Sequence, residues 1–191
     1  IAEQIDICPD KEYLASRGEY LNSKILAAYL GYAFVDAYDV VFFDEKGNLD
    51  REKTYSTFNN KVKNFDRAVI PGFYGQGADG RLKTFSRGGS DVTGAIAARA
   101  MSASIYENWT DVSGMKMADP RHIEDPETIP LLSYVELREL AYMGATVLHD
   151  EAVFPVRKAG IPINIRNTNR PTDDGTMIVE RASAKESKHI I

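Results

Sequence analysis

Phe85-Ser-Arg-Gly-Gly-Ser-Asp-Val-Thr-Gly-Ala-Ile-Ala-Ala-Arg99 leaves a strand, passes through a glycine pair and continues as a helix. Val92 and Ile96 recur at helical spacing and give that helix an apolar face. Ser90 and Asp91 are expected to cap its N-terminus. Because glycines let the backbone approach a ligand, and because the free N–H groups and dipole of a helix start favour negative charge, the stretch predicts an anion-binding turn.

Arg87 places a positive charge at this turn, and Asp91 places a negative charge there. The guanidinium of Arg87 suits a carboxylate or a phosphate, and the carboxylate of Asp91 can accept from an ammonium group. The pair therefore favours a ligand that carries both charges, such as an amino acid. The alternative is an ordinary helix cap beside a surface arginine.

Composition limits the function classes. The chain has 191 residues, a net charge of -5 and one cysteine, Cys8. An acidic chain argues against nucleic acid as a partner, and no apolar run reaches the ~18 residues of a membrane helix. One cysteine forms neither an internal disulfide nor a cysteine zinc cluster, and three scattered histidines give no metal-ligand spacing. The expectation is a cytoplasmic protein without a protein-bound metal.

Apolar runs and helical patterns alternate along the chain. The predicted helices cover 11–29, 50–64, 91–101, 133–144 and 149–158, and the predicted strands cover 33–35, 39–43, 68–73, 105–112, 162–166 and 176–179. A capping box at Ser133-Tyr-Val-Glu136 supports one helix start. This order predicts an α/β fold with a largely parallel sheet covered by helices on both faces.

Four motifs together resemble aspartate kinase, a branch of the amino-acid kinase family. They are Ser-Arg-Gly-Gly-Ser-Asp at 86–91, Trp-Thr-Asp-Val at 109–112, Ala-Asp-Pro-Arg at 118–121 and Met-Gly-Ala-Thr-Val-Leu-His at 143–149. Thr-Asp-Val is shared with acetylglutamate kinase, whereas Arg-Gly-Gly-Ser-Asp with Asp-Pro-Arg is more specific to the aspartate branch. The resemblance implies an amino-acid-kinase-like α/β sandwich that transfers the ATP γ-phosphoryl group, with Mg²⁺, to the side-chain carboxylate of L-aspartate. The product feeds lysine, threonine and methionine biosynthesis.

The resemblance also implies roles for single residues. Those expected to bind aspartate are Glu19, Phe73, Arg87, Ser90 and Asp91, with Arg87 and Asp91 serving catalysis as well. Those expected to bind the nucleotide are Thr110, Asp111, Lys116, Arg121 and Thr146. No metal ligand is assigned to the protein itself.

The sequence departs from the family pattern in several places. Lys116 stands where a relative has tyrosine, and Thr146 stands where many members have a lysine near the transferred phosphate. The lysine–phenylalanine–glycine–glycine motif of aspartate kinases is absent from the sequence. We therefore expect residues 1–179 to be part of a catalytic domain and 180–191 to be a polar tail or linker toward regulatory ACT domains, in a parent protein that forms a homo-oligomer.

Two alternatives remain open at this point. The chain could be a non-catalytic piece that binds nucleotide or amino acid, since a phosphate-contacting lysine motif is lacking. It could also be a related amino-acid kinase with another carboxylate substrate, which the Arg-Gly-Gly-Ser-Asp motif disfavours.

Overall fold

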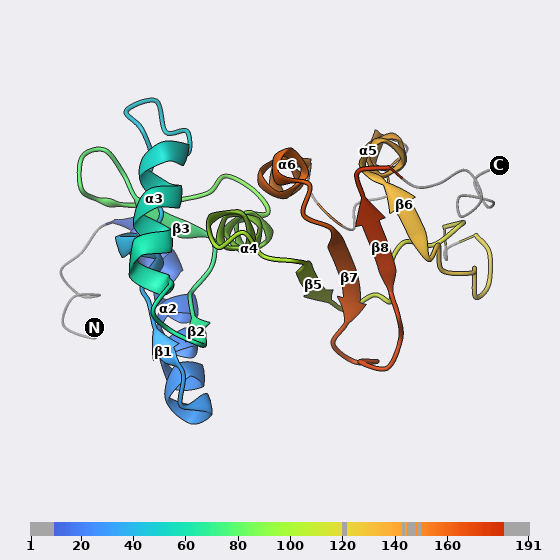
Figure 1. Ribbon diagram of the computed structural model, residues 1–191, viewed down its shortest axis with the longest axis horizontal. Helices are drawn as coiled ribbons and strands as arrows, with labels where there is room; N and C mark the ends of the chain where they lie inside the picture. Colours follow the sequence, from blue (N-terminus) through green and yellow to red (C-terminus); the bar gives the residue numbers. More distant parts are fainter. Residues whose placement is uncertain (1–9, 120–121, 143, 145–147, 149, 182–191) are drawn as a thin grey trace. The chain divides into compact units, whose positions relative to one another are not determined.

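The computed structural model describes residues 10–119, 122–142, 144, 148 and 150–181. The chain divides into two compact units, Ile1–Met101 and Ser102–Ile191. The elements of each unit are drawn in Figure 1. Helices and short, mainly parallel strands make up both units, and this confirms the predicted α/β class.

Among its described residues, the first unit carries three α-helices and two small sheets. Its elements are α2 (Lys11–Leu30), β1 (Ala33–Phe34), the 3₁₀ turn η1 (Ala37–Asp39), α3 (Arg51–Val62), β2 (Ala68–Val69), β3 (Tyr74–Gln76), β4 (Leu82–Thr84) and α4 (Gly89–Ala100). β1 pairs with β2 in parallel, and β3 pairs with β4 as an antiparallel hairpin. Helix α2 packs on β1, β2 and β4, while α3 packs against α4.

Two predictions in this unit were wrong. Residues 39–43 were expected to form a strand, but the chain turns through η1, and Phe42 and Phe43 make only isolated bridges to Gln76 and Leu49. Their side chains are buried nevertheless. The continuous apolar run therefore predicted burial correctly, but it did not predict the backbone conformation. The strand predicted for 68–73 ends at Val69, and the glycine-rich segment beyond it is partly the β3–β4 hairpin.

Helix α2 buries a face that its apolar pattern does not indicate. Its buried residues are Ser16, Ser23 and Ala27, whereas Leu21 and Ile25 are 41% and 68% exposed. Small side chains let the helix lie close to the strands beneath it, and the hydroxyl of Ser16 is satisfied by the carbonyl of Tyr13 at 2.7 Å. The helix predicted over 11–29 is confirmed, and the face that it buries is made of small side chains.

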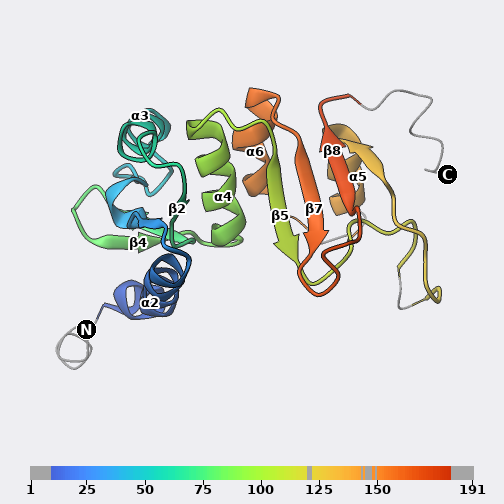
Figure 2. The same cartoon turned by 60° about the horizontal axis from the view of Figure 1, so that its bottom comes forward.

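The described part of the second unit is a four-stranded sheet with two helices. Its elements are β5 (Tyr106–Thr110), β6 (Leu131–Ser133), α5 (Tyr134–Tyr142), α6 (Asp150–Ala159), β7 (Ile163–Asn167) and β8 (Thr176–Val179). The strand order is β5-β7-β8-β6, with two parallel pairings and one antiparallel pairing between β7 and β8. Figure 2 shows α5 and α6 behind one face of this sheet.

The capping box at the start of α5 is confirmed. The N–H of Glu136 donates to Ser133 Oγ at 3.2 Å, and the N–H of Ser133 donates to Glu136 Oε2 at 2.7 Å. The core beneath the helix contains Leu132, Leu137, Ile163, Ile165 and Ile178, which are almost fully buried. Burial of this apolar surface holds the sheet whose strand ends carry the candidate site.

Candidate functional site

The glycine turn begins α4 in a left-handed conformation. Gly88 is the N-cap with φ 57°, and the helix begins at Gly89. Ser90 and Asp91 therefore lie in the first turn and are not caps, which corrects the sequence prediction. Because Gly88 has no side chain, no side-chain oxygen from the cap position takes up the first N–H groups of this twelve-residue helix. Such a helix start is suited to an anion.

The side chains at this turn face the surface. Arg87 and Ser90 are exposed, and Asp91 is half-buried. An exposed guanidinium next to uncapped N–H groups adds positive charge to the helix start. The arrangement can hold a carboxylate through two kinds of donor, and Asp91 brings a negative charge to the same turn.

Phe73 lies against the start of α4 in a strained backbone conformation. Its φ is +65°, which costs a non-glycine residue about 1–2 kcal/mol. Its N–H donates to Thr93 Oγ1 at 3.0 Å, and that hydroxyl donates to the carbonyl of Gly89 at 2.8 Å. A Cβ built on Gly89 would lie 2.7 Å from Phe73 Cβ, and one on Gly72 would lie 3.1 Å from Ser90 Oγ. The structure thus packs the segment of Gly72 and Phe73 against Gly89 and Ser90 at the start of α4.

Tyr74 anchors the residue that follows. Its ring is fully buried, and its hydroxyl donates to Asp36 Oδ1 at 2.7 Å. Burial, helped by the hydrogen bond to Asp36, raises the pKa of Tyr74 far above its ordinary value. The hydroxyl therefore keeps its proton at neutral pH and remains a fixed donor behind the Phe73 turn.

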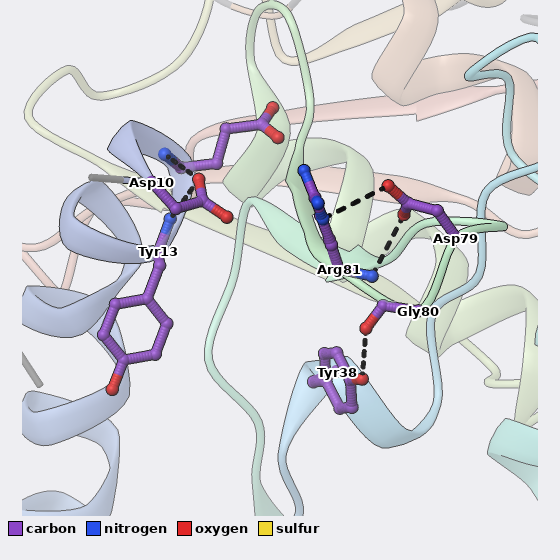
Figure 3. A network of polar contacts seen from close by, with 7 residues as sticks. Asp10, Tyr13, Tyr38, Asp79, Gly80 and Arg81 are labelled. Atoms are coloured by element: carbon purple, nitrogen blue, oxygen red, sulfur yellow. Dashed lines mark hydrogen bonds and ion pairs between the residues drawn. The ribbon is translucent and has the colours of Figure 1, made fainter. Parts of the chain in front are cut away.

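Glu19 lies on the exposed surface of α2. The helix begins at the N-cap Asp10, whose carboxylate accepts from the N–H groups of Glu12 and Tyr13 (Figure 3). Two residues before Glu19, the Arg17 guanidinium lies 4.3 Å from the ring centroid of Tyr13. Among the described residues, a Cβ on the neighbouring Gly18 would meet nothing within 4 Å, so this part of α2 has no close backbone contact. The expected role of Glu19 stays a prediction.

Thr110 and Asp111 lie at the carboxyl end of β5, as expected. Thr110 Oγ1 and Asp111 Oδ1 are 3.2 Å apart, and Asp111 is exposed. The neighbouring strand β7 runs parallel and ends beside Thr110 at Asn167. Carboxyl ends of parallel strands are where α/β proteins place ligands.

A polar loop after β7 closes over this strand end, and the sequence prediction missed its residues. Thr168 donates to the carbonyl of Thr110 through both its N–H, at 2.8 Å, and its Oγ1, at 2.9 Å. Ser113 Oγ donates to Asp173 Oδ2 at 2.6 Å and accepts from Asn167 Nδ2 at 2.9 Å. Residues 167–175 were not among the predicted site residues. The parallel order of the strands was the available signal, because it brings the loop after β7 beside the loop after β5.

Lys116 is held on a rigid turn. Its backbone forms an isolated antiparallel bridge with Thr128. The preceding Met115 is buried, and its N–H donates to Thr176 Oγ1 at 2.8 Å. A Cβ on Gly114 would lie 2.3 Å from that same hydroxyl oxygen, so only glycine fits there. Lys116 is half-buried.

Two of the expected nucleotide residues, Arg121 and Thr146, lie outside the described residues. Across the described part of the chain, no three side chains of histidine, cysteine, aspartate or glutamate gather as candidate metal ligands. Within that same part, no helix combines the length and apolar character needed to cross a bilayer.

Comparison with known proteins agrees with these features. The profile described as "Amino acid kinase family" matches residues 2–167. Aspartokinase 3 of Bacillus subtilis is 40% identical over 172 residues, which are 86% of this chain and 38% of the relative. This chain therefore spans well under half of that relative's length.

Two solved structures have a similar fold. The aspartate kinase of Clostridium acetobutylicum matches with a TM-score of 0.86 and 56% identity over 93% of this chain and 40% of that one. The Escherichia coli aspartokinase III in complex with aspartate and ADP matches with a TM-score of 0.82 and 26% identity, over 91% of this chain and 41% of that one.

Proposed function

This chain belongs to the amino acid kinase family, and from that premise we propose that it carries the substrate-binding part of an aspartate kinase. The reaction is transfer of the ATP γ-phosphoryl group to the side-chain carboxylate of L-aspartate. The similarity to enzymes named aspartokinase supports this substrate over another carboxylate.

The observation that carries the proposal is the glycine turn. Arg87 is exposed directly before a left-handed Gly88, and α4 starts there without a side-chain cap. Positive charge and the N–H donors of the helix start bind a carboxylate of the substrate, while Asp91 accepts from its ammonium group. Phe73 and Ser90 border the same place, and Glu19 supplies a further carboxylate for the ammonium group.

The second unit supplies the nucleotide residues in this proposal. Thr110 ends β5 and Asp111 follows it, while Lys116 lies further along the same connection, bridged to Thr128, and is proposed to offer positive charge to the phosphates. Arg121 and Thr146 complete the proposed set. Mg²⁺ arrives with the nucleotide and neutralises phosphate charge when bound. The parent protein is proposed to be a homo-oligomer of the cytoplasm.

The chemistry demands little proton transfer from the protein. A carboxylate is already ionised and nucleophilic at neutral pH, so no general base is required. The residues of this chain act by holding the aspartate and the nucleotide and by offsetting negative charge. Asp91 orients the ammonium group and does not remove a proton.

The test is calorimetric titration of the chain with L-aspartate, L-glutamate and N-acetylglutamate, each with Mg-ADP present. We expect selective aspartate binding. Arg87→Ala should weaken it by at least tenfold, because a charge-assisted hydrogen bond is worth about 1.5–3 kcal/mol. Arg81→Ala is the matched control, since Arg81 is exposed on the hairpin loop and pairs with Asp79 at 3.8 Å.

Each result has a clear meaning. Full aspartate affinity in the Arg87→Ala variant would refute the role of Arg87. Equal binding of all three acids, or nucleotide binding alone, would refute the aspartate assignment and leave the wider kinase family. Binding of both ligands without turnover would favour the non-catalytic alternative.

A further inference from the structure

Glu12 connects two segments that are far apart in the sequence. It lies in the first turn of α2, and its Oε1 accepts from the N–H of Thr84 at 3.2 Å and from Thr84 Oγ1 at 3.1 Å. The two residues are 72 positions apart. Hydrogen bonds to an ionised carboxylate are stronger than neutral ones, and two donors from one residue restrict its orientation.

Each end of this contact lies near a residue that is proposed to bind the substrate L-aspartate. Thr84 is the last residue of β4, shortly before Arg87 and the glycine turn. Glu12 lies about two helical turns before Glu19 on the same continuous helix. Since an α-helix is stiff over that length, the contact sets how the helix that carries Glu19 lies against the strand that delivers Arg87.

The other polar residues near Glu12 do not connect α2 to the β3–β4 hairpin. A cleft of about 660 Å³ separates the first turn of α2 from the β3–β4 hairpin, and its lining includes Asp10, Lys11, Asp79 and Arg81. Figure 3 shows that Asp10 caps its own helix, while Arg81 turns back to Asp79. Among the described residues that line the cleft, Glu12 is the one whose hydrogen bonds join the two sides.

The other side of the strand end is fixed independently. The N–H of Phe85 donates to the carbonyl of Phe73 at 2.9 Å, and the Phe85 ring lies 4.8 Å from that of Phe43. The segment before Arg87 is therefore held by Phe73 on one side and by Glu12 on the other. Loss of Glu12 would free one side only, which shifts the loop without dismantling the core.

We propose that Glu12 is a positioning residue for the aspartate site, acting through Thr84 on the Arg87 turn. The inference rests on the proposed function and assigns Glu12 no contact with substrate. Loss of Glu12 is expected to lower the affinity for aspartate and not the affinity for the nucleotide, because the proposed nucleotide residues Thr110, Asp111 and Lys116 belong to the other unit.

The experiment compares Glu12→Ala, Glu12→Gln and Thr84→Val with Glu45→Ala, which removes a carboxylate from an exposed turn. Affinities for L-aspartate and Mg-ADP are measured by calorimetry. Glu12→Ala should weaken aspartate binding about tenfold and leave Mg-ADP unchanged. Glu12→Gln should stay within threefold because its amide oxygen still accepts, and Thr84→Val should lie between them because its N–H remains.

A second measurement needs no ligand. Amide hydrogen exchange should become faster at residues 84–91 in Glu12→Ala and stay unchanged in the second half of α4. Unchanged exchange at 84–91, normal aspartate binding, or equal loss of both ligands in Glu12→Ala would each overturn this inference alone. Wild-type protein that takes no aspartate would overturn the proposed function as well.

Discussion

The buried hydroxyl group of Tyr134 links α5 to the segment before β7. Tyr134, at the start of α5, is 3% exposed and donates its hydroxyl proton to the carbonyl of Ile161. Burial raises the pKa of Tyr134 from its ordinary value of 10.0 to about 12. Between these values the unfolded chain loses the proton that the folded chain keeps. Stability from this group is therefore complete below pH 10 and is lost as the pH rises towards 12.

Tyr134→Phe tests this relation. At pH 8 the variant should be less stable than the wild type by about 1 kcal/mol, because the carbonyl of Ile161 loses its donor. The difference should shrink between pH 10 and 12, since phenylalanine has no proton to lose. The stability difference between wild type and variant is measured from urea unfolding midpoints between pH 8 and pH 12. Tyr142→Phe is the control at a 78% exposed tyrosine, and a difference for Tyr134→Phe that stays constant to pH 12 would contradict the prediction.

Two glycines in helices show how element packing decides the effect of one methyl group. Gly18 lies inside α2, where an added Cβ would meet nothing within 4 Å among the described residues. Gly89 begins α4, where an added Cβ would lie 2.8 Å from the Cα of Phe73. The same substitution is therefore expected to have opposite signs at these two positions.

Gly18→Ala should stabilise the chain by about 1 kcal/mol, because alanine has the better helix propensity. Gly89→Ala should destabilise it by about 1–3 kcal/mol, because the Phe73 backbone cannot yield without disturbing the turn. Thermal unfolding measures both, and calorimetry should show weaker aspartate binding for Gly89→Ala only. A stabilising Gly89→Ala would mean that the two segments are not tightly packed.

At the scale of the whole molecule, the two units divide the proposed ligands between them. The residues proposed for aspartate lie within Ile1–Met101, and those proposed for the nucleotide lie within Ser102–Ile191. Substitutions in one unit should therefore change one affinity and spare the other when each ligand is titrated alone.

Lys116→Ala makes this division testable. It should weaken Mg-ADP binding about tenfold, because a charged donor to phosphate is lost, and it should leave aspartate affinity unchanged. Lys46→Ala, on the exposed turn at 44–48, is the matched control. Unchanged Mg-ADP affinity in Lys116→Ala would remove Lys116 from the nucleotide site, and a loss of aspartate affinity would contradict the division between units.

Local sequence patterns predicted most elements because their causes are local. The helix periodicity of residues 51–62, the capping box at Ser133 and the strand at 106–110 all depend on neighbours within a few positions. The glycine pair before α4 likewise indicated a special turn. The pattern failed for Leu21 and Ile25, since which face of α2 is buried depends on the strands it meets.

By itself, then, the sequence determined the α/β class, the family resemblance and the residues to expect at the glycine turn and at the end of β5. Only the tertiary structure decided that Thr168 closes on Thr110 and that Glu12 reaches Thr84 across 72 positions. The physical reason is range. Propensity and periodicity act between near neighbours, whereas these contacts join segments whose separation along the chain carries no local signal.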